Sequence, residues 1–514
     1  MGTERKTTID RARRALLVAA AALLALPAAT TPATAQPRDE LRVGVWDLPP
    51  SRGNPFGGRS VPSTFVWDAV YDPLVRIDES GAPVPVLATE WRVTDPTTWI
   101  FRLRPGVAFS NGTPMNADAV VATLEFLTTQ AGRATPVGSE LTNLAGVRKV
   151  DDLTVEVKTT GPDPVLPNRL TLVSIVEPNL WRSGGAEGYA ANPIGTGPYK
   201  VDSWGAGQVA LSANPNAWRK PQLPKLRVLE LPERPARLQA LQSGQIDVAM
   251  GLSPDNMPAM RAANLQVVST PAPQVMSIAF VTEGRDNSPF KDVRVRQALN
   301  YAVNKDVMAK ELLAGLVRGT AQGATSAAFG YHPSLPAYPY DPERAKRLLR
   351  EAGFPNGFTL VAEVTVDAFP ADSEVYQQMA MDLDAVGVKT ELRQIRFPEW
   401  LRKFTSNGWE GLAFGSSWNA APYMDSIRPY TYMSCMKRPA HYCDPEVMPL
   451  IEASNAEFDR EKRKAILLKL HELTRDRPPA LFLVEQVDVT GVSARVQGFR
   501  YTNRIVQYEA VTLR

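Results

Sequence analysis

The stretch from Asp341 to Val364, DPERAKRLLREAGFPNGFTLVAEV, encodes a complete helix followed by a strand. Its first residue is a favourable N-cap, Pro342 suits the first helical position, and Gly353 is a natural left-handed C-cap. The apolar run Phe358–Val364 that follows predicts a strand. A helix that ends at a glycine and leads into a strand is a building unit of α/β folds.

The same unit recurs along the chain. Residues 373–395 give a helix, Gly387 and a strand, and residues 235–250 give a helix, Gly244 and a strand at 246–250. Helical spacing of apolar residues predicts two more helices. Alternating patterns predict further strands. The helices are expected over 116–128 and 292–313, and the strands over 41–46, 99–109 and 153–159. The fold class is therefore predicted as α/β.

The first 35 residues have the pattern of a secretory signal peptide. Arg11, Arg13 and Arg14 precede an apolar run over 15–29, and Ala33-Thr34-Ala35 is a small-x-small cleavage site. The alternative, a membrane anchor, needs about 20 apolar residues. The adjacent arginines leave a twin-arginine signal open. Because no cysteine stands at the cleavage site, a lipid anchor has no attachment point, and we expect a periplasmic protein.

The net charge excludes two classes of partner. Residues 1–35 hold five basic and two acidic residues out of 57 and 54 in the chain, so the 479 residues that remain carry 52 of each. A neutral protein has no electrostatic footprint for nucleic acid or for an anionic membrane. A chain of this length is too long for one core, so two or more lobes are expected.

Two cysteines, Cys435 and Cys443, lie in the segment CMKRPAHYC. A close pair in an exported protein is typical of a disulfide. A zinc site needs four ligands. His441 is the single histidine nearby, so we favour the disulfide.

Catalytic motifs were tested and none was found. Residues 192–200, NPIGTGPYK, contain two glycines, but Pro198 removes a backbone donor where a phosphate would need one, and the following residues alternate like a strand. No G-x-S-x-G or H-E-x-x-H motif is present. We expect no cofactor, no metal and no enzyme activity. Gly195 and Gly197 are predicted to need backbone angles forbidden to other residues, in a rigid turn that leads into a strand near Tyr199.

Six blocks, in order, resemble the family 5 extracellular solute-binding proteins, the peptide, nickel and opine receptors of bacterial ABC importers. The blocks are VWDAVYDPLVRID (66–78), PVLATEWRVTDPTTWIFRLRPGVAFSNGTPMNADAVVATLEFL (85–127), NPIGTGPYKVDSW (192–204), ALQSGQIDVAM (240–250), SPFKDVRVRQALNYAVNKDVM (288–308) and DPERAKRLLREAGF (341–354). Together they cover nearly all of the chain after the signal peptide.

The resemblance implies a two-lobed periplasmic binding protein fold of type II, with an extra inserted domain. Lobe I would comprise 36–62, 187–272 and 483–514, the inserted domain II 63–186, and lobe II 273–482. The crossings between the lobes would form a hinge. A small-molecule or peptide-like ligand would lie between the lobes of a monomer, and an inner-membrane ABC permease would receive it.

The loop Gly415–Ser426 is expected at the ligand. In similar peptide receptors this loop supplies an aspartate for the α-ammonium group, but the matching position here is near Ala421. The loop also resembles that of nickel-chelate receptors, with aromatic residues. Its candidate contacts are Trp418, Asn419, Tyr423 and Asp425. Alternatively, Trp418 packs beneath the loop and Tyr423 is a turn residue.

The other wall is expected from Trp46, Asn54 and Phe56. Gly251, Phe280 and Phe369 are lesser candidates, and each suits a core position equally well. Two other functions remain open: a secreted hydrolase with carboxylates in a cleft, and a periplasmic sensor or chaperone that reuses the receptor fold.

Overall fold

The computed structural model describes residues 39–58, 61–366 and 368–514. The expected signal peptide, with its cleavage site and paired arginines, lies outside the described residues. None of the described helices is both long enough and apolar enough to cross a membrane.

A ten-stranded mixed sheet is the centre of the fold, in the order β14-β13-β15-β12-β16-β11-β1-β10-β9-β8. We call β11, β1, β10, β9 and β8 the β1 half, and β14, β13 and β15 the β13 half. The bounds are β1 Glu40–Val45, β8 Tyr199–Gly205, β9 Gln208–Ala213, β10 Lys225–Glu230, β11 Val248–Leu252, β12 Gln266–Phe280, β13 Phe358–Val364, β14 Val388–Gln394, β15 Ala413–Asn419 and β16 Ala480–Val492.

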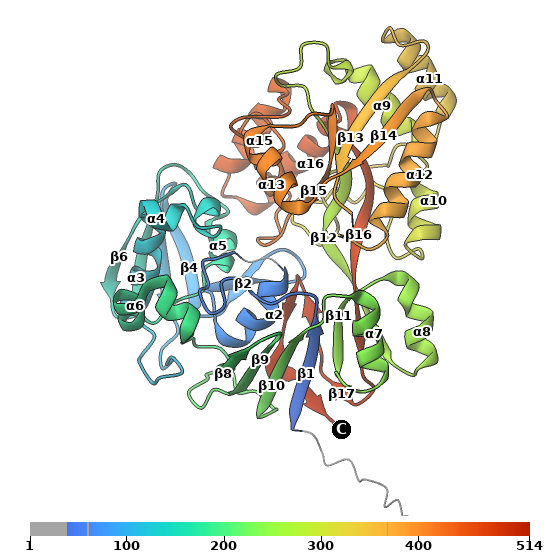
Figure 1. The fold of residues 1–514 in the computed structure, drawn as a ribbon. Helices are drawn as coiled ribbons and strands as arrows, with labels where there is room; N and C mark the ends of the chain where they lie inside the picture. Colours follow the sequence, from blue (N-terminus) through green and yellow to red (C-terminus); the bar gives the residue numbers. More distant parts are fainter. Residues whose placement is uncertain (1–38, 59–60, 367) are drawn as a thin grey trace, which may run out of the picture. The chain divides into compact units, whose positions relative to one another are not determined.

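The two longest strands, β12 and β16, join the halves (Figure 1). The first part of β12 pairs with the end of β16, where β11 also pairs, whereas the last part of β12 pairs with β15. The register of β12 against β16 shifts between Pro271 and Val275. Proline lacks the N–H that a ladder needs, so the prolines at 271 and 273 explain the break.

The predicted lobe boundaries at 272/273 and 482/483 fall inside β12 and β16 respectively. A register shift between paired strands bends them locally. The boundaries and the hinge between the lobes stay a prediction, and the register shift lies beside the predicted boundary in β12.

A separate four-stranded antiparallel sheet, in the order β4-β5-β7-β6, carries helix α3 against β6 and β7. Three two-stranded sheets pair β2 with β3, β17 with β20 and β18 with β19. Their bounds are β2 Val75–Ile77, β3 Pro83–Pro85, β4 Ala88–Asp95, β5 Thr98–Leu103, β6 Leu144–Asp151, β7 Thr154–Thr159, β17 Val496–Gln497, β18 Tyr501–Thr502, β19 Ile505–Val506 and β20 Thr512–Leu513.

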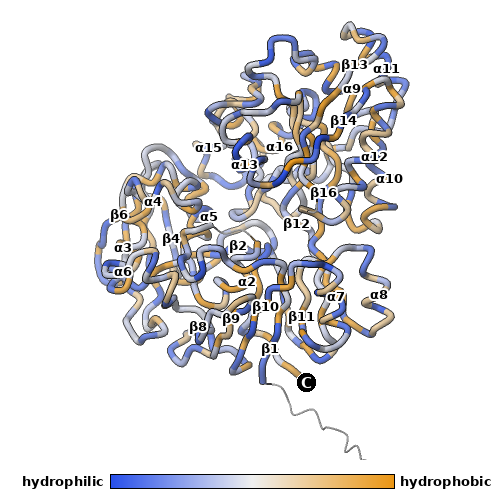
Figure 2. The backbone as a smooth tube through the Cα atoms, in the orientation of Figure 1, coloured by the Kyte–Doolittle hydropathy of each residue, from blue (hydrophilic) through white to orange (hydrophobic). Residues whose placement is uncertain are grey.

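The helices are mostly short. Many of the hydrophobic residues lie on the buried strands (Figure 2). They are α2 Val61–Val70, α3 Ala117–Thr128, α4 Gln130–Arg133, α5 Leu166–Arg169, α6 Pro178–Ala191, α7 Arg234–Gln242, α8 Met257–Ala262, α9 Val293–Ala302, α10 Lys305–Val307, α11 Pro342–Glu351, α12 Asp372–Asp384, α13 Phe397–Ser406, α14 Ile427–Tyr432, α15 Met448–Ala456 and α16 Arg460–Asp476. Single helical turns lie at Gly138–Glu140, Leu170–Leu172, Pro254–Asn256, Pro289–Lys291, Met308–Leu312 (a π-turn), Pro445–Val447 and Tyr508–Ala510.

The helix-glycine-strand units are confirmed. The Asp341 side chain accepts a hydrogen bond from the backbone N–H of Arg344, and α11 ends before Gly353, which has φ +91°. Strand β13 follows. The predicted alternation therefore gives α11-β13 and α12-β14 as adjacent units of the β13 half.

Two predicted elements are shorter than expected. The helix predicted over 292–313 ends at Ala302 because Val303 is extended and the Asn304 side chain accepts a hydrogen bond from the Val307 N–H, which starts a new helix. The strand predicted over 99–109 ends at Leu103, before a turn in which Gly106 has φ +74°.

The turn at 192–200 leads into β8 at Tyr199, as expected, but the reason for its glycines was wrong. Neither Gly195 nor Gly197 has a left-handed φ. Instead, both lie against the end of α2: a Cβ on Gly195 would overlap the Val70 carbonyl oxygen, and one on Gly197 would lie 2.5 Å from the Ala69 oxygen. The Gly197 N–H donates to the Val70 carbonyl at 2.9 Å, so the turn satisfies a terminal carbonyl of α2.

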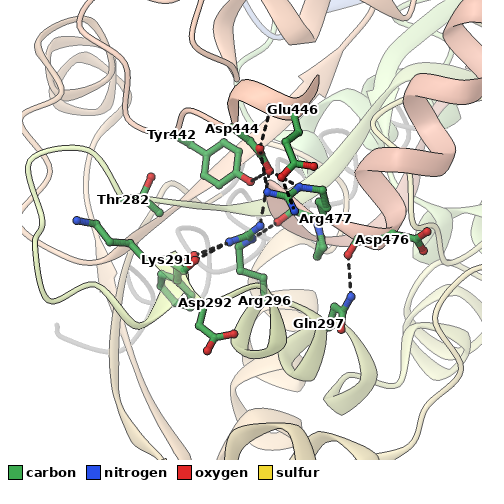
Figure 3. Close-up of polar contacts among 12 residues, drawn as sticks. Thr282, Lys291, Asp292, Arg296, Gln297, Tyr442, Asp444, Glu446, Asp476 and Arg477 are labelled. Atoms are coloured by element: carbon green, nitrogen blue, oxygen red, sulfur yellow. Dashed lines mark hydrogen bonds and ion pairs between the residues drawn. The ribbon is translucent and has the colours of Figure 1, made fainter. Parts of the chain in front are cut away.

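The expected disulfide joins Cys435 to Cys443. An ion-pair network anchors the chain just beyond it (Figure 3). Asp444 accepts two hydrogen bonds from Arg477, at 2.8 and 3.1 Å, and lies 3.9 Å from the Arg296 guanidinium. Arg296 also donates to the backbone carbonyls of Pro478 and Phe290. The network therefore ties the disulfide segment to α9 and to the approach to β16.

Candidate functional site

A cavity of about 770 Å³ has walls from both halves of the sheet. This volume is in the range of small-molecule sites. We call it the central cavity. Its lining includes Trp46, Val61, Pro62, Glu233, Arg234, Arg237, Gly251 and Leu252 from the β1 half and α2, Gln274 and Gln486–Val489 from the joining strands, Ala368–Pro370, Phe397 and Asn419 from the β13 half, and Arg504.

The floor of the central cavity lies where β12 and β16 change register. Gln274 and Gln486 are both buried there, and the Gln274 Nε2 donates to the Gln486 Oε1 at 2.7 Å. The Gln486 Nε2 has no hydrogen-bond partner among the described residues. A buried amide that keeps a free donor at a cavity is available to a ligand acceptor.

Arg237 forms the wall of the β1 half. It is 3% exposed, and its guanidinium donates to the backbone carbonyls of Leu231, Pro232, Met250 and Gly251. Burial, which disfavours the charged form, and the neighbouring positive charge of Arg234 together lower the pKa of Arg237 to about 10.

Trp46 covers this arginine. The Arg237 guanidinium lies 5.9 Å from the ring centroid of Trp46. Gly251 has φ +63°, and a Cβ there would lie 2.6 Å from the indole ring, so glycine is required for both reasons. The wall is thus a tryptophan face supported by a buried cation.

A second cavity, of about 450 Å³, adjoins the first and shares Gln274, Phe369, Phe397 and Asn419 with it. We call it the aromatic cavity, because one side is a ladder on α13. Trp400 stacks on Phe397 at 5.9 Å between ring centroids and on Phe404 at 4.8 Å, with planes within 10°. The Trp400 Nε1 donates to the Gly415 carbonyl, which fixes the indole. Phe397 is 62% exposed, so an apolar group bound here would cover it.

A third cavity, of about 470 Å³, shares Phe397, Asn419 and Arg504 with the central cavity. Ala421 and the ion pair between Glu140 and Arg428, at 2.5 Å, line it. Burial by itself would raise the pKa of Glu140, but the charge and hydrogen bond of Arg428, together with hydrogen bonds from Tyr423 and Tyr432, outweigh it and hold the pKa below its usual range. The carboxylate is therefore already neutralised by an arginine.

The structure brings four predicted site residues together at the central cavity. Trp46 and Gly251 lie on one wall, and Phe369 and Asn419 lie on the other. Phe369 and Asn419 also line the aromatic cavity. Ligand contact by these four residues stays a prediction.

The other six predicted residues do not line any of the three cavities described here. Phe56, Phe280 and Trp418 are fully buried in hydrophobic packing, where Phe280 stacks on Phe290 at 4.4 Å. The Asn54 side chain accepts a hydrogen bond from the Phe56 N–H within its own turn. Apolar side chains next to a cavity gain free energy by packing inward, and ligand contact by these residues stays a prediction.

Tyr423 and Asp425 have hydrogen-bond partners within the protein. The Tyr423 hydroxyl donates to Glu140 at 2.9 Å, so the tyrosine is part of the ion-pair cluster. Asp425 is 2% exposed and accepts two hydrogen bonds from Arg463, at 2.6 and 3.0 Å. Both carboxylate oxygens accept from the Arg463 guanidinium, and ligand contact by Tyr423 and Asp425 stays a prediction.

Sequence reasoning missed the polar residues of the floor and the wall. Arg237, Gln274, Gln486 and Arg504 carry no motif. A weak signal existed for Phe397, because it is followed by Trp400 and Phe404 at helical spacing.

The described residues contain no group of three histidine, cysteine or acidic side chains able to hold a metal. His441 and His471 are buried, and burial lowers the pKa of each to about 3, so both are neutral. In the central cavity, Asp488 accepts hydrogen bonds from Arg504 at 2.7 and 2.8 Å.

Solved structures of known proteins define the class of fold to which this chain belongs. Two solved structures share the fold: DppA of Helicobacter pylori in complex with peptide STSA (22% identity, 92% of this chain, 98% of that chain, TM-score 0.77) and NikZ of Campylobacter jejuni in complex with Ni(L-His) (20%, 92%, 98%, TM-score 0.76). The fold is that of the two-lobed periplasmic binding proteins.

The family follows from the sequence match. The model of the bacterial extracellular solute-binding proteins, family 5 middle region, matches residues 82–438, and the chain belongs to this family. Among its relatives is the glutathione-binding protein GsiB of Shigella dysenteriae serotype 1, which is 25% identical over an alignment of 471 residues that covers 87% of this chain and 89% of the relative. At the family level, these are binding proteins of ABC transporters and not enzymes.

Proposed function

We propose that this protein is the periplasmic substrate-binding component of an ABC importer and that it captures a small peptide-like or chelate ligand in the central cavity. One observation carries the proposal: the walls of that cavity come from both halves of the sheet, and its floor is the register shift of the two strands that join them. A ligand bound there contacts both halves at once.

Closure would follow from this placement. A ligand that contacts both walls stabilises the arrangement in which they approach, and the bend would be taken up by β12 and β16 near Pro271. The closed form would be recognised by an inner-membrane ABC permease, to which a monomer delivers its ligand.

The chemical range of the ligand is suggested by the relatives. The proteins compared above are described as binding glutathione, a peptide and a nickel-histidine chelate. Ala421 lines the third cavity. It lies near the position at which peptide receptors resembling this chain have an aspartate for the ammonium group. A metal would arrive with its own chelator, because the described residues offer no three-ligand group.

We further propose that the chain binds its ligand without changing it. The acids Asp488 and Glu140 are paired with arginines, which is unlike the opposed carboxylates of a glycosidase. Mass spectrometry of the ligand recovered from the protein should therefore find it intact. A cleaved or modified product would favour the hydrolase alternative.

Export to the periplasm is part of the proposal, with the segment 1–35 as a cleaved signal. N-terminal sequencing of the exported protein should begin at Gln36. Replacing Arg13 and Arg14 by lysine would block export by the twin-arginine route and leave the general route working, so fractionation of the variant distinguishes the two.

Thermal-shift screening against peptide, chelate and opine libraries, with native mass spectrometry of the purified protein, tests the binding function. A ligand at about a hundred times its dissociation constant stabilises the folded state by about 2.7 kcal/mol. If no compound raises the melting temperature or stays bound, the importer function loses its support.

The Phe397→Ala variant localises any binding that is found. Leu401→Ala on the same helix is its matched control, because Leu401 is also exposed, at 47%, but does not line the described cavities. Weaker binding in the first variant with unchanged binding in the second would place the ligand at these cavities.

A further inference from the structure

The central cavity has an uncompensated positive charge in its β1-half wall. Arg237 is 3% exposed, and no described carboxylate lies within ion-pair distance of it; its hydrogen-bond partners are four backbone carbonyls. Carbonyl dipoles satisfy the donors of a guanidinium, but they do not cancel its charge. Because Arg237 is buried, its charge is screened less by solvent than a charge at the surface would be.

The amino-terminal end of α7 faces the same space. Residues 233–235 and 237 line the cavity, and α7 is nine residues long with no side-chain hydrogen bond at its N-cap, Glu233. Arg234, the first residue of the helix, also lines the cavity, and no described group accepts a hydrogen bond from its Nε. The positive end of a helix and a cation beside it favour a bound anion.

Gln486 supplies a second and independent observation. Its side chain is part of the same cavity lining and is 5% exposed, and its Nε2 has no described partner. Leaving a buried N–H unpaired costs about 1–3 kcal/mol, so an acceptor from a ligand would satisfy a donor that the fold leaves open.

The other charged residues at the three cavities do not make the wall around Arg234 and Arg237 negative. Four arginines and three carboxylates line them among the described residues. Asp488 is paired with Arg504, and Glu140 is paired with Arg428. Glu233 is exposed and lies beside the two remaining cations.

We propose that the ligand presents a carboxylate group to the wall formed by Arg234, Arg237 and Gln486. This inference rests on the proposed binding function and narrows it to acidic ligands. The carboxylate would belong either to a peptide or to a metal chelator, and both sources share the chemistry that this wall recognises.

Matched acidic and neutral probes test the proposal by native mass spectrometry. The first pair is a tryptic digest of a purified protein and the same digest after methyl esterification, and the second is nickel with L-histidine or with L-histidinamide. We expect retention of the acidic member of one pair, at least about fivefold above its neutral counterpart, and the pair that binds identifies the source. Equal retention of both members would overturn the inference while leaving the binding function intact.

The variant Arg234→Gln removes one cation of the wall. Arg261→Gln is the control, because Arg261 is an exposed arginine on α8 that does not line the cavity. We expect retention of the acidic probe to fall about fivefold in the first variant, as the loss of one partly exposed charge pair of about 1 kcal/mol implies, and to stay unchanged in the second. Equal retention in both variants would contradict the assignment.

Fluorescence quenching of the protein without any ligand tests the inference independently of probe retention. If no probe is retained, the proposed binding function itself fails. Iodide and caesium quench tryptophan fluorescence with opposite charges, and the Trp46→Phe variant isolates the contribution of Trp46. We expect the ratio of iodide quenching to caesium quenching at Trp46 to be at least about twofold higher than the same ratio for free N-acetyltryptophanamide, and to fall in Arg234→Gln. A ratio equal to that of the free reference would overturn the proposal.

Discussion

Glu485 is expected to make the stability of this protein fall as the pH rises through the neutral range. It lies on β16 opposite Val275, at the register shift of the joining strands, and is 6% exposed. Its Oε1 has no described hydrogen-bond partner, and its Oε2 lies 3.8 Å from the Nε of Arg318, which is 64% exposed. Burial raises the pKa of Glu485 from 4.5 to about 7, and Arg318 offsets only a part of this.

The free energy of unfolding falls with rising pH because the folded and unfolded chains bind different numbers of protons. Between about pH 4.5 and pH 7, the unfolded chain has lost the proton of Glu485 while the folded chain keeps it, so the free energy of unfolding decreases as the pH rises. A pKa difference of about 2.5 units corresponds to about 3 kcal/mol. Below the unfolded pKa the penalty is absent, and above about pH 7 it is complete.

The substitution Glu485→Gln removes the ionisation and keeps the size of the side chain. Urea unfolding across the range from about pH 4.5 to pH 8 should show the variant gaining on the natural protein as the pH rises, by up to about 3 kcal/mol. Glu452→Gln, at an exposed position with no described ion pair, should show no such trend. A pH-independent difference between Glu485→Gln and the natural protein would refute the buried-acid argument.

Three further predictions concern the turn, the buried ion pair and the cavity. Gly195→Ala should lower the free energy of unfolding by about 3 kcal/mol or more because the added Cβ overlaps backbone atoms. Gly161→Ala, where no atom lies within 4 Å of the added Cβ, should change it by less than about 1 kcal/mol. Equal urea midpoints for the two variants would contradict this prediction. Arg463→Met should cost about 3–5 kcal/mol because it leaves Asp425 charged and buried, and calorimetry that finds an unchanged melting temperature would argue against it. Phe397→Ala should leave the melting temperature of the free protein unchanged, since the side chain is 62% exposed, and should weaken binding about tenfold by titration calorimetry; unchanged affinity would exclude Phe397 from the site.

Local signals in the sequence were sufficient for the elements and for the family. The N-cap at Asp341 and the glycines at 353 and 387 act within one turn of a helix, so they give the same result in the sequence as in the fold. The disulfide also follows from two cysteines eight residues apart. The ordered family blocks predicted the binding-protein fold, which the comparisons confirm.

The break in the helix predicted over 292–313 was not predicted, because it depends on hydrogen bonds of Asn304 that replace those of a continuous helix. Apolar spacing continues through 292–313, but Asn304 uses its side chain to begin a new helix and its backbone N–H to reach Asp382, at 2.8 Å. The second partner is 78 residues away in sequence, so no local pattern contains it.

The glycines at 195 and 197 illustrate the same limit. The sequence determined that small residues were needed at the turn, but not why. A rule about backbone angles was the local explanation, and the actual cause is the end of α2, which lies more than 100 residues earlier in the chain.

The sequence by itself thus determined the α/β units, the cysteine pair, the zero net charge of residues 36–514 and the family of this protein. The tertiary structure alone decided which residues face the cavities. Gln274 and Gln486, for example, are 212 residues apart and meet because β12 and β16 pair across the join. Whether an aromatic or polar side chain points into a cavity or into the core depends on such long-range pairing, and a single sequence records the residue type without the partner.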